Sequence, residues 1–161
     1  MNVLGFQEAC DTALSITVNG RLSVPVATAQ AMLLLKLIAW EDRHDRLPGK
    51  DASDIAQILY HGEKIIDEDA FYGAYSQATE AVGWDLELAS ARIIGLKMAA
   101  ITLGRPRAHL LAVLDRELAK GEESILVREV AANFPTGRTD LERVPALLQQ
   151  VRAGLIGEAA P

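Results

Sequence analysis

The longest apolar stretch of the chain is the feature that most constrains its fold. It runs from Ala27 to Trp40 and is interrupted mainly by Gln30 and Lys36. Thr28 is a good N-cap residue, so a helix is predicted from there to about Arg43. A helix that is apolar on nearly all sides has to be covered by neighbours, and we expect it to lie at the centre of the fold. It is shorter than the ~20 apolar residues that span a bilayer, so no membrane association is predicted.

The elements around this helix indicate an α+β fold that is mainly α. Residues 15–18 and 21–26 alternate polar and apolar on either side of Asn19-Gly20, a dipeptide that favours a tight β-hairpin turn. About six helices are expected after the hairpin, in a chain that is 50% hydrophobic but only 5% aromatic. Gly62 should stop the second of them, the third begins at about residues 67–69 with an apolar stripe that reaches Val82, Asp85 can cap the fourth, and the last runs from near Thr139 to about Leu155. The 161 residues suit one domain, with residues 1–26 as a residual sheet segment and residues 27–156 as a helical region.

Net charge bears on which classes of partner the chain can bind, and the cysteine content bears on the cellular compartment in which it is found. The formal net charge is −6, which gives no electrostatic support for a nucleic-acid partner. Cys10 is the only cysteine, so no disulfide can form within the chain, and the N-terminus has no basic segment typical of a signal peptide. These features predict a cytoplasmic protein.

Lys36 and two aspartates are the first candidates for chemistry. A buried ammonium group is costly unless it is paired, so Lys36 should either reach the surface or line a cleft that contains anions. Asp51 and Asp54 are three residues apart and share a face at the start of a predicted helix over residues 51–60. They can cap that helix and favour its positive first turn, or they can pair with Lys36 or a substrate group. The spacing alone leaves both interpretations open.

Several segments together resemble the later motifs of AbiEii-type nucleotidyltransferases, toxins of toxin–antitoxin pairs in the polymerase-β-like nucleotidyltransferase superfamily. The central block is LLKLIAWEDR at residues 34–43 followed by KDASDI at residues 50–55. It has the family's pattern of a Lys inside an apolar helix, a loop, and then Lys or Arg with Asp-x-x-Asp opening the next helix. The segments LASARIIG at 88–95, LLAVLDRE at 110–117 and VLGFQEA at 3–9 resemble one bacterial branch of the family.

The resemblance implies transfer of a nucleotide from a nucleoside triphosphate with the help of Mg²⁺. It assigns catalytic roles to Lys36 and Asp51. Nucleotide-binding roles fall to Lys50, Asp54, Trp40 and Arg43. No residue of this chain is predicted to bind the metal, because the Gly-Ser turn and the Asp-x-Asp strand that precede these motifs in the family have no counterpart here. We therefore expect the C-terminal part of the family fold, from a truncated gene product, a mis-assigned start or a shortened domain.

Two other interpretations remain open beside an incomplete enzyme. The chain can be a non-catalytic helical binding module that acts through a protein partner or an oligomer, or a structural helical domain in which the Asp-x-x-Asp motif of Asp51 and Asp54 is only a cap. The expected partners are a cognate antitoxin or a second copy of the chain, joined through the edge of the hairpin, and a nucleic-acid acceptor follows from the resemblance alone. If Lys36 belongs to a site, its amine should lie close to Asp51 or Asp54.

Overall fold

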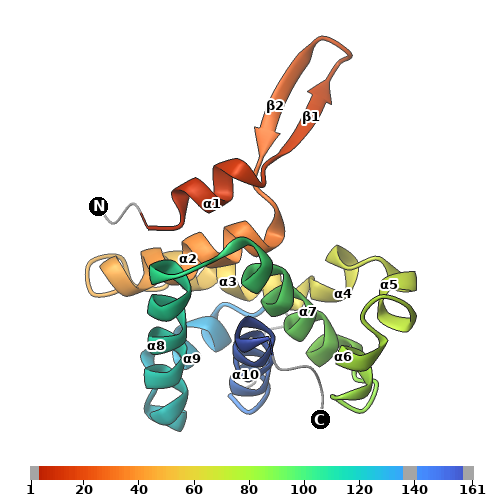
Figure 1. The fold of residues 1–161 in the computed structure, drawn as a ribbon. Helices are drawn as coiled ribbons and strands as arrows, with labels where there is room; N and C mark the ends of the chain where they lie inside the picture. The colour runs from red at the N-terminus through yellow and green to blue at the C-terminus, as the bar shows by residue number, and fades with distance from the viewer. Residues whose placement is uncertain (1–3, 136–140, 158–161) are drawn as a thin grey trace.

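The structure, a computed structural model, describes residues 4–135 and 141–157. It confirms the predicted class: a mainly helical chain with one antiparallel β-hairpin near the N-terminus. Figure 1 shows the hairpin projecting from a body of packed helices. The first elements in chain order are α1 (Phe6–Asp11), β1 (Leu14–Val18), β2 (Leu22–Val26), α2 (Ala29–Arg43), α3 (Lys50–Tyr60) and α4 (Gly62–Ile65). They are followed by α5 (Glu68–Tyr72), α6 (Ser76–Glu80), α7 (Leu86–Ile101), α8 (Arg105–Ala119), the 3₁₀ turn η1 (Gly121–Glu123), α9 (Ile125–Ala132) and α10 (Arg143–Ile156).

Helix α2 lies where the sequence predicted and has the predicted cap. The Thr28 side chain accepts a hydrogen bond from the backbone N–H of Ala31, and the helix ends at Arg43. It packs against α1, α3, α7 and α8, and its large side chains form much of the core. One side remains open, because Met32 is exposed and Lys36 is half-buried. The open side is where the candidate site forms.

Helices α7 and α10 cross with their backbones close together. Gly95 and Gly154 face each other there, and a Cβ atom on either one would overlap with backbone atoms of the opposite helix. The two backbones can approach this closely only because glycine has no side chain. The crossing fixes α10 against α7, the helix that also supports α2.

The hairpin has the predicted turn but a slightly different register. Asn19 and Gly20 both have positive φ, 52° and 67°, as a tight Asn-Gly turn requires. Val18 pairs with Leu22, so Arg21 belongs to the turn rather than to β2. Directly opposite residues share a face, and the pairs Leu14–Val26, Ile16–Val24 and Val18–Leu22 therefore make one face of the ribbon apolar.

Two local predictions differ from the structure, and a third lies outside the described residues. A single helix was expected over residues 67–82, but the chain turns at Gly73 (φ −108°, ψ −101°) and divides it into α5 and α6. Gly62 was expected to stop a helix, and it instead begins the one-turn helix α4. The last helix was expected to begin near Thr139, which lies outside the described residues; α10 is described from Arg143. Asp85 caps α7 as predicted, by accepting a hydrogen bond from the N–H of Leu88 at 3.0 Å.

Within residues 4–135 and 141–157, no helix is both long enough and apolar enough to cross a membrane. Cys10, in α1, is exposed.

Candidate functional site

Lys36 and Arg43 lie on one face of α2, and Asp51 and Asp54 lie on the facing side of α3. Residues seven apart in a helix are two turns apart on the same face, and residues three apart are neighbours. The packing of α3 against α2 therefore brings two cations and two carboxylates together. The Nζ atom of Lys36 lies 2.5 Å from Oδ2 of Asp54 and 3.4 Å from Oδ1 of Asp51. The predicted proximity of Lys36 to these two aspartates is confirmed.

Asp51 is the centre of this network. Its side chain is 2% exposed, and it accepts two hydrogen bonds of 2.7 Å from the guanidinium of Arg43, through Nε and Nη2. The backbone cap of α3 is Gly49, whose φ is 74°, and the structure shows no side-chain cap. The interpretation of Asp51 as a helix cap is therefore wrong, because its oxygens are occupied by side chains of α2.

The two carboxylates differ in how firmly they are held. The forked pair between Arg43 and Asp51 is the geometry that gives strong, directional ion pairs. Asp54 holds Lys36 through one short contact, and its side chain is 48% exposed, so water competes for it. We call Lys36, Arg43, Asp51 and Asp54 the α2–α3 network. Asp51 is its fixed member, and Asp54 is its exchangeable member.

Electrostatics keep Lys36 and Asp51 charged at neutral pH. The hydrogen bonds from Arg43, aided by its charge, hold the pKa of Asp51 below its ordinary value despite the cost of burial. The hydrogen bond to Asp54 raises the pKa of Lys36 above its ordinary value. Lys36 is therefore an ammonium group and cannot act as a general base near neutral pH. Its chemistry is that of a hydrogen-bond donor and a positive charge.

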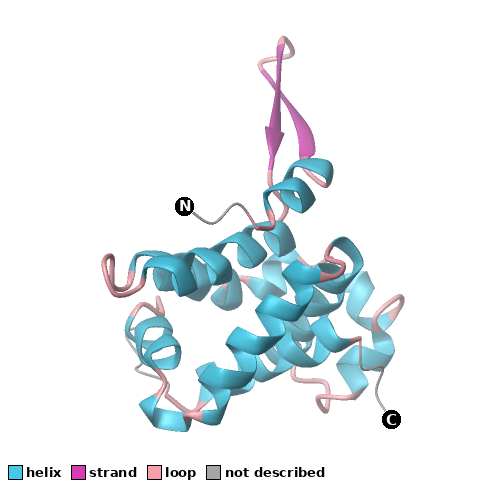
Figure 2. Cartoon of the chain, turned by 60° about the vertical axis from the view of Figure 1, so that its left-hand side comes forward, coloured by secondary structure: helices cyan, strands magenta, loops and turns pink. Residues whose placement is uncertain are grey.

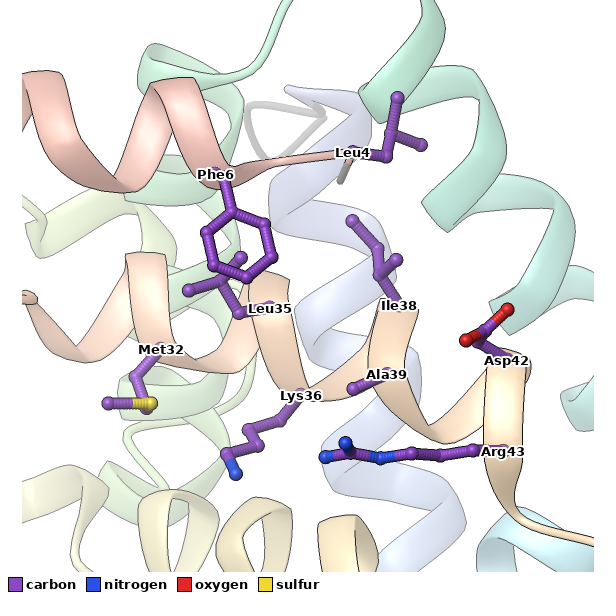
Figure 3. A pocket seen from close by; sticks show the side chains of 9 residues that line it. All are labelled: Leu4, Phe6, Met32, Leu35, Lys36, Ile38, Ala39, Asp42 and Arg43. Carbon is purple, nitrogen blue, oxygen red and sulfur yellow. The ribbon is translucent and has the colours of Figure 1, made fainter. Parts of the chain in front are cut away.

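A pocket of about 260 Å³ opens beside the network. Lys36, Asp42 and Arg43 supply its polar wall, and in Figure 3 the nitrogen ends of Lys36 and Arg43 converge below the apolar residues. The rest of the wall is apolar and comes from the chain before and within α1 and from α2: Leu4, Phe6, Met32, Leu35, Ile38 and Ala39. The shape suits a ligand with an apolar or planar part and a polar group directed at Lys36.

The charges of the network nearly cancel. Lys36 and Arg43 are balanced by Asp51 and Asp54, and Asp42 at the pocket wall adds a further carboxylate. An anionic ligand therefore has to replace one of these carboxylates as the partner of Lys36. Asp54 is the residue that can be replaced, because it is half exposed and its only ion pair within the described residues is the one with Lys36.

Asp51 and Asp54 do not fit a divalent cation. Their oxygens lie 2.5–3.4 Å from the ammonium of Lys36, and those of Asp51 are also bonded to Arg43, so Mg²⁺ would sit against positive side chains. The Mg²⁺ implied by the resemblance would need other carboxylates. In the described part of the chain, no group of three or more His, Cys, Asp and Glu residues is arranged to hold a metal ion.

The remaining predicted residues lie outside the network. Lys50 is exposed at the first position of α3 and forms no ion pair within the described residues. Trp40 is 1% exposed: its Nε1–H donates to Glu129 at 2.8 Å, and its ring stacks on His44 with centroids 4.3 Å apart. Trp40 is therefore a core residue that ties α2 to α9, and the buried indole offers no face to a nucleotide in this conformation.

The sequence did not reveal that Arg43 fixes Asp51. Both residues were candidates, but eight positions and a loop separate them, and no helical period links residues across a loop. A signal was present in Arg43 itself, since it lies seven positions after Lys36 and thus on the same face of α2.

Comparisons of the chain with models of protein families, with curated proteins and with solved structures gave no match in any of the three.

Proposed function

We propose that this chain is a nucleotidyltransferase-like protein of the AbiEii type that contributes a phosphate-contacting lysine, Lys36, to a nucleotide site. The observation that carries the proposal is the α2–α3 network beside the pocket. A Lys within an apolar helix and an Asp-x-x-Asp pair on the next helix are the residues of the resemblance, and they meet in space.

The network suits a phosphate as the ligand of Lys36. The Arg43–Asp51 pair is buried on the Asp51 side and holds the lysine between α2 and α3. The contact to Asp54 is half exposed, and such pairs contribute only ~0–1 kcal/mol, so a phosphate oxygen can take its place at low cost. A hydrogen bond between an ammonium and a phosphate is among the stronger polar contacts in proteins. The apolar wall of the pocket would face the base or sugar of the nucleotide.

The proposal also holds that this chain does not transfer nucleotides alone. Transfer in this superfamily relies on divalent metal held by carboxylates, which neutralises the charge of the transferring group. Asp51 and Asp54 do not fit that role, because each is paired with a cation. The metal and most of the triphosphate would be bound by a segment or chain other than the one described. A cytoplasmic location is part of the same proposal and is supported by the single, exposed Cys10.

Equilibrium binding of labelled ATP, GTP, CTP and UTP to the purified chain tests the proposal. We expect one of them to bind, and Lys36→Gln to weaken that binding about tenfold or more, as expected for loss of a charged hydrogen bond. Lys64→Gln, which removes an exposed lysine of α4, is the matched control and should bind like the unmodified chain. Equal effects of the two variants, or no binding of any triphosphate, would contradict the proposed site.

A second candidate is a non-catalytic binding module that acts through a protein partner or a second copy of the chain. The hairpin favours it. The large side chains of its apolar face are between 42% and 61% exposed at Leu14, Ile16, Val18, Leu22 and Val26. A two-stranded hairpin alone is marginal in water, and a continuous exposed apolar surface marks an interaction site.

Measuring the oligomeric state in solution tests whether the binding module acts by pairing with a second copy of the chain. Light scattering after size exclusion should show a dimer that Ile16→Ser weakens. Ser15→Ala, on the opposite face of the same strand, should leave the dimer unchanged. A monomer at all concentrations would exclude self-association and leave a different protein as the partner.

A further inference from the structure

Two aromatic side chains form an exposed stacked pair far along the chain from the α2–α3 network. Tyr72 ends α5 and is 57% exposed, and Trp84 precedes α7 and is 50% exposed. Their ring centroids are 5.8 Å apart and the rings are nearly parallel, at 16°. Large aromatic rings are usually covered in a monomer, and Tyr and Trp are enriched where proteins bind one another. The pair is therefore a candidate contact surface.

The backbone at Trp84 adopts an energetically unfavourable conformation. Gly83 and Trp84 have φ values of 64° and 65°, and this left-handed conformation is unfavourable for a bulky residue such as tryptophan. It is held by a hydrogen bond of 3.0 Å from the N–H of Trp84 to the carbonyl of Thr79. The Thr79 hydroxyl in turn donates to the carbonyl of Phe71, which joins α6 to α5. The strained residue is not used to fill the core, and strain of this kind clusters at functional sites.

The segment of the chain that carries the pair is acidic, and the cations near it belong to other segments: Arg143 in α10 and Lys97 in α7. Residues 65–91 contain six carboxylates and no Lys, Arg or His, in a chain whose net charge is −6. Asp85 and Glu87 are paired with Arg143. The other four, Asp67, Glu68, Asp69 and Glu80, are exposed and form no ion pair within the described residues.

These carboxylates lie close to the rings along the chain. Glu68 and Asp69 are four and three residues before Tyr72, respectively, and thus on its side of α5. Glu80, at the end of α6, is four residues before Trp84. Figure 1 shows α5 and α6 on the side of the helical body away from α8, and Figures 1 and 2 both show the hairpin projecting out of the body.

We propose that Tyr72, Trp84, Glu68, Asp69 and Glu80 form a docking surface for an arginine-rich segment of a protein partner. A guanidinium group stacks on the face of tryptophan or tyrosine, and the same group pairs with carboxylates through two parallel hydrogen bonds. The charge complementarity selects a basic polypeptide and repels nucleic acid, whose phosphates would face these carboxylates. The surface is separate from the α2–α3 network, so it does not depend on the proposed nucleotide site.

The test is titration of the full chain with a short synthetic Arg-rich peptide, followed by calorimetry and by acrylamide quenching of tryptophan fluorescence. The chain has two tryptophans, and only Trp84 is accessible to the quencher because Trp40 is 1% exposed. We expect the peptide to protect Trp84 from quenching. Tyr72→Leu with Trp84→Leu keeps every charge and should weaken binding about tenfold or more if the rings stack on the partner.

A charge-matched control separates a defined surface from general attraction to an acidic protein. Glu68→Gln with Glu80→Gln should weaken binding several-fold. Glu122→Gln with Glu123→Gln removes the same charge from the exposed turn η1 and should have a smaller effect. Equal losses in the two charge variants, full affinity without the aromatic rings, or no protection of Trp84 in the unmodified chain would each overturn the proposal. Circular dichroism checks that the variants fold. The quenching measurement on the unmodified chain needs no variant, so it tests the proposal even if a variant fails to fold.

Discussion

Replacement of Asp51 by asparagine should destabilise the fold far more than the same replacement at Asp54. Asp51→Asn keeps the shape of the side chain but removes its charge and turns one acceptor into an amide donor. That donor would face the N–H groups of Arg43, which now point at the two carboxylate oxygens at 2.7 Å. Asp54→Asn makes the same chemical change three residues later, at a side chain that is 48% exposed.

The expected loss of stability in Asp51→Asn follows from the burial of Asp51 and from the number of hydrogen bonds that it accepts. Asp51 is 2% exposed and accepts two short hydrogen bonds from Arg43 and one long one from Lys36. Hydrogen bonds to charged groups contribute ~1.5–3 kcal/mol each. Lys36 and Arg43 are 21% and 33% exposed, so water replaces part of what they lose. We expect Asp51→Asn to lower the free energy of unfolding by about 2–3 kcal/mol, or the Tm by about 4–12 °C for a chain of this size. Asp54→Asn should cost below about 1 kcal/mol.

The difference in free energy of unfolding between the unmodified chain and Asp51→Asn should depend on pH in a defined direction. Arg43 holds the pKa of Asp51 below its ordinary value, so the carboxylate stabilises the fold at pH values above the pKa of the unfolded chain. This stabilisation is lost as the pH falls through the lower pKa of the folded state. The difference between the unmodified chain and Asp51→Asn should therefore be constant from pH 5 to neutrality and shrink below about pH 4.

Urea denaturation followed by circular dichroism at several pH values measures these differences. The reasoning is refuted if Asp51→Asn is as stable as the unmodified chain at pH 7, or if the two replacements cost the same. A difference that grows as the pH falls would also contradict it.

Three further predictions concern the rest of the fold and its activity. Gly95→Ala should lower the free energy of unfolding in urea by about 1–3 kcal/mol or more, because the added Cβ overlaps with the α10 backbone. The control is Gly121→Ala, where no atom lies within 4 Å of the added Cβ, and it should lower the free energy of unfolding only by the ~1 kcal/mol of a left-handed residue. Equal losses in the two variants would contradict the close crossing of α7 and α10. Amides of residues 15–26 should exchange with solvent much faster than those of residues 31–40, because the hairpin is exposed and α2 is buried; equally slow exchange in a monomeric sample would show that the hairpin is supported within one chain. The chain incubated with labelled nucleoside triphosphates, Mg²⁺ and bulk RNA or protein should label neither, and robust labelling would show that it carries a complete site.

The sequence predicted the elements that short-range rules control. The Thr28 cap, the length of α2, the Asn19-Gly20 turn and the Asp85 cap all depend on residues within a few positions of one another, and the structure confirms each of them. The break at Gly73 was missed because the apolar stripe of residues 71–82 continues with helical spacing across it.

The candidate site was predicted in part. The cost of an unpaired ammonium limited Lys36 to the surface or to a cleft that contains anions, and its proximity to Asp51 or Asp54 was predicted for the case in which it belongs to a site. The sequence did not predict that Asp51 is fixed and Asp54 exchangeable, because both residues lie at the start of the same apolar stripe of α3. Which one is enclosed depends on the rotation of α3 against α2. Trp40 received a nucleotide-binding role from the resemblance, and the sequence gives no sign of whether its ring faces a pocket or its N–H bonds to Glu129.

The most direct test of the proposed nucleotide site is the NMR signal of the Lys36 ammonium during titration with the triphosphate that binds best. Exchange of Asp54 for a phosphate oxygen changes the immediate partner of Nζ, so the Lys36 signal should shift and saturate with the same affinity as the bulk binding curve. The signal of Lys64, in α4, should stay unchanged. If bulk binding saturates while the Lys36 signal does not move, the nucleotide binds elsewhere, and Lys36 is only an internal partner of Asp51 and Asp54.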